Sequence, residues 1–136
     1  MIEAYFAQLE GILRDFPNIQ SYSLTKKIYN LKQGYMSGAI VFENGCRLDF
    51  VEVKDTELAG KIKYRYQYMD AKQELVFRYD NAPHHKDGEA FPHHKHTLTE
   101  VQGSREPTLH DILLEIVQLE RVGIRDQVRR KLTPGE

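Results

Sequence analysis

Apolar residues recur along this chain with two different periods. From Ile2 to Phe16 they fall at every third or fourth position, which is the spacing of an amphipathic helix, and Pro17 is expected to end it. The same spacing returns between Leu109 and Leu119. Between these segments the period changes to two, as in strands that bury one face. The pattern therefore predicts a helix near each end of the chain and strands between them.

The start of the C-terminal helix carries a recognisable cap. Thr108 stands at the expected N-cap position, and Asp111 follows three residues later, as in a capping box. Gly123 is expected to end this helix. The segment 124–132, "IRDQVRRKL", is then expected to form a short additional helix.

Two hairpins are predicted in the middle of the chain. Asn44 and Gly45 lie between two β-rich runs, which predicts a two-residue turn with positive φ at both positions. A second hairpin is expected over Lys61–Asp80, with its turn at 69–73. We predict an α+β fold: one antiparallel sheet of four to five strands, flanked by N-terminal and C-terminal helices.

Alternation also predicts which side chains share a face of the sheet. On the returning strand Phe77 and Tyr79 lie on one face, while Arg78 and Asp80 lie on the other. The charged pair is expected to share its face with Arg65 of the preceding strand. This face is therefore predicted to be polar, and the opposite face to pack against the core.

Glu52 breaks the expected alternation. It falls on the same side of its strand as Leu48 and Phe50, where a carboxylate is costly unless it has a partner. Two interpretations remain open: either Glu52 meets a cation or has a functional role there, or a twist or bulge of the strand returns it to water. Glu52 is retained as a candidate site residue.

Composition limits the class of protein. With 136 residues and 40% hydrophobic content, the chain is expected to form one domain over 1–136. Its 19 basic and 20 acidic residues do not give the field of a strongly basic nucleic-acid binder. No apolar run has the length of a membrane span and the N-terminus does not resemble a signal peptide, so we expect a cytoplasmic protein without membrane contact. Cys46 is the single cysteine, which excludes a disulfide framework.

Five of the six histidines lie within 84–96, in two clusters that each follow a proline. Histidine titrates near neutral pH, so this density suggests a site of proton transfer. RNA supplies its own nucleophile, the 2′-hydroxyl, and a protein that cleaves it needs a base, an acid and a cation. We expect two of the histidines to act as base and acid without a metal or other cofactor. The candidate site residues are Glu52, Arg65, Arg78, Asp80, His84, His85, His93, His94 and His96.

Other interpretations of the histidines remain open. One is a binding module that holds a metal ion or nucleic acid without turnover, because alternate histidines such as His94 and His96 project from one face of an extended segment. A weaker one is group transfer to a nucleotide, which the absence of a glycine-rich phosphate loop disfavours. An exposed loop without function is favoured for any single histidine, but not for five within this short segment.

The segment Tyr64–His96 resembles the TumE family of bacterial and archaeal toxin-antitoxin proteins. The resemblance is carried by "RYDNAPHH", residues 78–85, and by "PHHKH", residues 92–96. It implies a growth-inhibiting toxin that acts on RNA and is neutralised by a cognate helix-turn-helix antitoxin. It extends more loosely upstream through the hairpin that contains Glu52, and covers about two thirds of the chain.

Overall fold

The computed structural model describes residues 1–83 and 92–131, and side chains as far as residue 123. It divides into two compact units, one formed by Met1–Glu106 and one that begins at Pro107. The first unit holds helix α1, Ile2–Asp15, and all the strands, and the second holds helix α2, Leu109–Lys131. The predicted α+β class and the terminal helices are confirmed, whereas a single domain over 1–136 stays a prediction.

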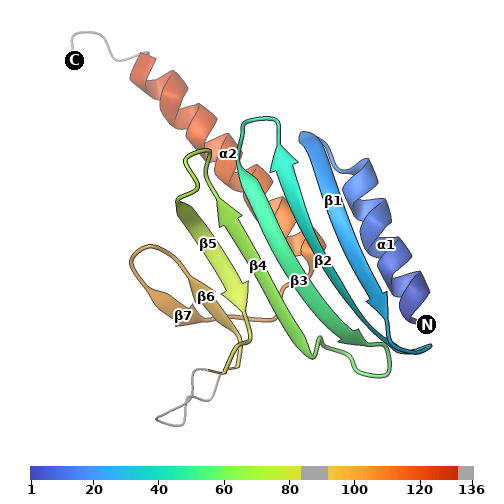
Figure 1. Cartoon of the computed structure of the whole chain (residues 1–136). Coiled ribbons are helices and arrows are strands. Elements are labelled where there is room, and N and C mark those ends of the chain that lie inside the picture. Colours follow the sequence, from blue (N-terminus) through green and yellow to red (C-terminus); the bar gives the residue numbers. More distant parts are fainter. Residues whose placement is uncertain (84–91, 132–136) are drawn as a thin grey trace. The chain divides into compact units, whose positions relative to one another are not determined.

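The strands form one antiparallel meander in which each pairs with the next along the chain (Figure 1). They number seven in the described residues, so the expected four to five is wrong. Three were missed because β1 is exposed on both faces and shows no alternation, while β6 and β7 have only three residues each. The strands are β1 Ile19–Ile28, β2 Gln33–Phe42, β3 Arg47–Asp55, β4 Lys63–Met69, β5 Leu75–Asp80, β6 His94–His96 and β7 Val101–Gly103.

The two faces of the sheet differ in burial. Helix α1 packs beside β1 and β2 on what we call the inner face, and a Cβ at Gly34 would lie 2.9 Å from atoms of both Ile2 and Phe6. The lack of a side chain at Gly34 therefore lets the helix seat closely. The opposite side, the outer face, bears the residues between the buried ones. Buried inner-face residues include Met36, Ile40, Leu48, Phe50, Tyr64, Tyr66, Tyr68 and Phe77.

Both predicted hairpins are confirmed, but the first turn differs from the prediction. Of the residues in this turn only Gly45 has a positive φ, 88°. The Gly45 amide donates to the Phe42 carbonyl, and the Phe42 amide donates to the carbonyl of Cys46. The connection is therefore a three-residue loop, a tight turn followed by a left-handed residue, rather than a two-residue turn.

Helix α2 begins as predicted and ends later. The Thr108 amide donates to the Asp111 carboxylate and the Asp111 amide donates to the Thr108 hydroxyl, both at 3.0 Å, which confirms the capping box. The helix continues through Gly123 to Lys131, so the expected end at Gly123 and the separate short helix are wrong. A glycine inside a helix costs about 1 kcal/mol, which good helix formers on either side can outweigh.

Two glycine substitutions test the packing. In Gly38→Ala the new methyl group would lie 2.5 Å from Phe50 and 2.7 Å from Leu24, so we expect the free energy of unfolding to fall by roughly 1–3 kcal/mol. In the matched Gly123→Ala nothing lies within 4 Å, and we expect a gain of about 0.5–1 kcal/mol. Urea unfolding followed by circular dichroism measures both. Equal stability of Gly38→Ala and the wild type would contradict close packing at this point of β2.

Candidate functional site

Five of the predicted site residues come together on the outer face of β4, β5 and β6. In the sheet register Asp80 lies between Arg65 on one side and His94 on the other, and Arg78 lies opposite His96. One oxygen of Asp80, Oδ2, lies 3.0 Å from Arg78 Nε and 3.3 Å from His96 Nε2. The rings of His94 and His96 have centroids 6.3 Å apart. We call Arg78, Asp80, His94 and His96 the outer-face cluster.

The outer-face cluster is unusual for its burial. Asp80 is 5% exposed, His94 4% and His96 7%, although neighbouring outer-face side chains are partly or fully exposed. A buried carboxylate is costly without partners, and Asp80 has both a guanidinium and an imidazole. A carboxylate beside an imidazole fixes the ring orientation and stabilises its protonated form. The cluster therefore has the components for moving a proton next to a fixed positive charge.

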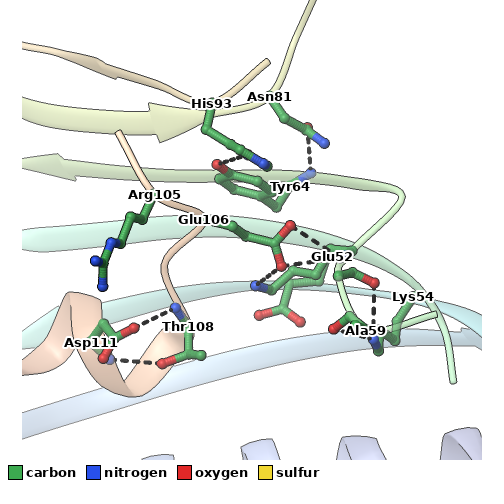
Figure 2. Close-up of polar contacts among 12 residues, drawn as sticks. Glu52, Lys54, Ala59, Tyr64, Asn81, His93, Arg105, Glu106, Thr108 and Asp111 are labelled. Carbon is green, nitrogen blue, oxygen red and sulfur yellow. Dashed lines mark hydrogen bonds and ion pairs between the residues drawn. The ribbon is translucent and has the colours of Figure 1, made fainter. Parts of the chain in front are cut away.

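His93 lies on the other side of the sheet. Its Nδ1 is 2.9 Å from the hydroxyl of Tyr64, and the two rings stack with centroids 5.8 Å apart. Figure 2 shows His93 and Asn81 both reaching Tyr64, where the Asn81 side chain accepts from the Tyr64 amide. His93 is therefore apart from His94 and His96, because consecutive residues of an extended segment point to opposite faces.

Glu52 is fully buried on the inner face. The hydroxyls of Tyr5 and Tyr66 both donate to its carboxylate, the latter at 2.5 Å. It has neither returned to water nor formed an ion pair with a described cation. The sheet separates Glu52 from Asp80, so the structure does not bring it to the outer-face cluster.

A second polar group on the inner face was not predicted. Glu106 accepts from the backbone amide and the ammonium of Lys61, whose Nζ also lies 5.2 Å from the centroid of the Tyr64 ring. Lys54 is buried as well, and its ammonium donates to the carbonyls of Leu58, Ala59 and Gly60. Figure 2 shows Lys54 close to Ala59. The only sequence signal was the position of Lys54 on the buried side of its strand. These contacts satisfy buried charges and tie the β3–β4 connection to Glu106.

The inner-face tyrosines remain protonated at neutral pH. Burial raises the pKa of Tyr66 well above its ordinary value, and the negative charge of Glu52 raises it further. Burial and Glu52 act in the same way on the pKa of Tyr5. Burial, followed by the charges of Glu106 and Asp80, raises the pKa of Tyr64. The Tyr5 and Tyr66 hydroxyls therefore act as donors to Glu52 rather than as proton carriers.

The last two candidates, His84 and His85, lie outside the described residues. Tyr64, Tyr66 and Tyr68, which alternate along β4, are core residues. Within the described ranges, no group of three or more His, Cys, Asp or Glu side chains is arranged to hold a metal ion.

Comparison with known families defines the class of the protein as a toxin. The matching family model is toxin TumE, and it covers residues 9–122. The chain therefore belongs to the TumE family, and a toxin of this kind implies an antitoxin partner. No curated protein and no solved structure matches the chain. In the described part of the chain, no helix is both long enough and apolar enough to cross a membrane.

The buried tyrosines predict loss of stability at alkaline pH. Unfolded tyrosine ionises near pH 10.0, whereas the pKa values of Tyr5 and Tyr66 are raised in the folded chain. The stability that these raised values contribute is fully present below about pH 10 and is lost as the pH rises above it. Urea unfolding at a series of pH values should show this decline.

Tyr66→Phe tests the source of that decline. It removes one hydrogen bond to a buried carboxylate, so we expect a loss of roughly 1.5–3 kcal/mol at pH 8 and a shallower decline above pH 10. Tyr22→Phe is the control, because Tyr22 is 41% exposed. An unchanged alkaline decline in both variants would mean that the Glu52 network is not its source.

Proposed function

We propose that the chain is a cytoplasmic ribonuclease toxin that cleaves RNA by metal-independent proton transfer at the outer-face cluster. The observation that supports this most is the buried Asp80 carboxylate, placed between Arg78 and His96 and beside His94. This arrangement combines imidazoles, a group that orients one of them, and a cation for developing negative charge. Those are the groups that the reaction requires.

The reaction follows from the chemistry of RNA. The 2′-oxygen attacks the adjacent phosphorus while one imidazole takes the hydroxyl proton, and the bond from phosphorus to the 5′-oxygen breaks as a second imidazole protonates that oxygen. The products are a 2′,3′-cyclic phosphate and a 5′-hydroxyl. Asp80 orients His96, and Arg78 and Arg65 bind the phosphate, whose charge grows in the transition state.

The other predicted site residues have different places in the proposal. His84 and His85 remain candidates for base or acid together with His94 and His96. His93 is proposed as a support, because its bond to Tyr64 holds the segment that enters β6. Glu52 belongs to the inner-face network, and a direct part in catalysis stays a prediction. The antitoxin is expected to be of the helix-turn-helix type, on the basis of the family resemblance.

Cleavage of defined single-stranded RNA in excess EDTA tests the proposal. We expect fragments that end in 2′,3′-cyclic phosphate, and loss of at least a hundredfold in rate in His94→Ala, because general acid-base groups contribute on the order of 10²–10⁴. His110→Ala is the matched control, since His110 is exposed in the first turn of α2. Asp80→Asn should also lose activity, because it removes the negative charge beside His96.

The outcomes separate the candidate mechanisms. RNA that stays intact in EDTA but is cleaved when zinc or manganese is restored would make the histidines metal ligands and contradict proton transfer by imidazoles alone. RNA that is bound but never cleaved would favour the binding module. Elemental analysis of untagged protein would then show whether a metal ion is held.

Expression in growing cells gives a second test. We expect His94→Ala and His85→Ala to abolish growth inhibition while His110→Ala retains it, because only the first two remove a candidate base or acid. Circular dichroism and solubility of the purified variants establish that they fold. Full toxicity of folded His94→Ala would overturn the role of the outer-face cluster.

A further inference from the structure

The outer face carries cations that no described acid neutralises. Its acidic side chains are engaged: Asp49 with Arg47 at 2.7 Å, Asp80 with Arg78 and His96, and Asp55 with the Gln33 amide at 2.9 Å. The remaining outer-face cations in the strands are Lys27, Lys63 and Arg65, all exposed. In the described ranges none of these three has a carboxylate within ion-pair distance.

These cations border a flat floor of small and apolar side chains. Two rows of side chains cross the sheet from β4 through β3 to β2. One row is Arg65, Val51 and Ser37, and the other is Lys63, Val53 and Tyr35. The side chains of this floor are partly exposed rather than covered. Arg65 is also the direct neighbour of Asp80, so the floor is continuous with the outer-face cluster.

We propose that single-stranded RNA lies across the outer face from β6 toward β2, with phosphates at Arg65 and Lys63 and bases against Val51, Val53 and Tyr35. This inference rests on the proposed function and names the form of its substrate. An open sheet face with a partly exposed aromatic ring favours unpaired bases, because only unpaired bases can lie flat on side chains. Positive charge beside the floor matches the phosphate backbone.

The positions of these side chains favour single-stranded RNA as the ligand of the outer face. Arg65, together with Arg78, would hold the phosphate that is cut, and Lys63, on the same strand and face as Arg65, would hold a phosphate further along. Tyr35 lies two strands from Lys63 in the same row, at about 10 Å given the usual strand spacing. The groups are therefore spread over several nucleotides rather than gathered on one.

Fluorescence anisotropy with a labelled single-stranded RNA of mixed sequence tests the inference. The full chain with His94→Ala prevents cleavage, and titrations at several salt concentrations in EDTA give affinity and salt slope. We expect Lys63→Ala to weaken binding severalfold and to reduce the slope of log K against log salt by about 0.7, the loss of one phosphate contact. Tyr35→Ala should weaken binding about tenfold, and Tyr35→Phe should restore it.

Lys72→Ala is the matched control, because Lys72 is an exposed lysine in the β4–β5 turn, outside the floor. With His94 intact, Lys63→Ala should raise KM for RNA and leave kcat unchanged, whereas Lys72→Ala should change neither. The inference is overturned if Lys63→Ala and Lys72→Ala behave alike, or if duplex RNA binds as tightly as the single strand.

The two proposals fail in different ways. Cleavage that depends on His94 but not on Lys63 or Tyr35 would support the proposed ribonuclease activity and contradict the proposed path of the RNA. RNA binding that depends on Lys63 and Tyr35, without cleavage by the chain that retains His94, would support the proposed path and contradict the proposed ribonuclease activity. Loss of antitoxin binding in Lys63→Ala, with RNA binding unchanged, would assign the face to the antitoxin instead.

Discussion

The strict alternation of side chains across an antiparallel sheet is the constraint on which this structure depends. It sends His94 and His96 to one face and His93 to the other, although the three are nearly contiguous. A slip of one residue in β6 would exchange these faces and dismantle the outer-face cluster. The His93 contact with Tyr64, and the bond from the Ser104 amide to the His93 carbonyl, oppose such a slip. Packing on the inner face thus fixes the positions of His94 and His96 on the outer face.

The two buried carboxylates of the sheet show two ways to make a buried charge tolerable. Glu52 accepts hydrogen bonds from hydroxyls that stay protonated at neutral pH, so the charge of its partners does not change there. Asp80 lies instead between a guanidinium and an imidazole, and the imidazole belongs to a class of side chain that titrates near pH 7. The two buried carboxylates therefore differ in their partners, which are neutral hydroxyls for Glu52 and ionisable side chains for Asp80.

Sequence patterns predicted those parts of the fold that repeat regularly. The alternation of Arg65, Arg78 and Asp80, the capping box of α2 and both hairpins follow from local physics, and the structure has them. The strands β6 and β7 were not predicted, because a segment of three residues is too short to show a period. Alternation placed His94 and His96 on one face, but it did not predict the contact of His93 with Tyr64 or the hydroxyl partners of Glu52 from α1 and β4. These features depend on contacts between residues that are distant in the chain, and the pattern of a single sequence does not predict such contacts.

The sequential meander has a consequence for how the protein is made. Every strand pairs with the one before it, so most pairings, though not that of β5 with β6, close a short loop and the sheet has little need of contacts between distant parts of the chain. Arg65, Asp80 and His96 come from three successive strands. They can assemble during synthesis, before the last residues leave the ribosome.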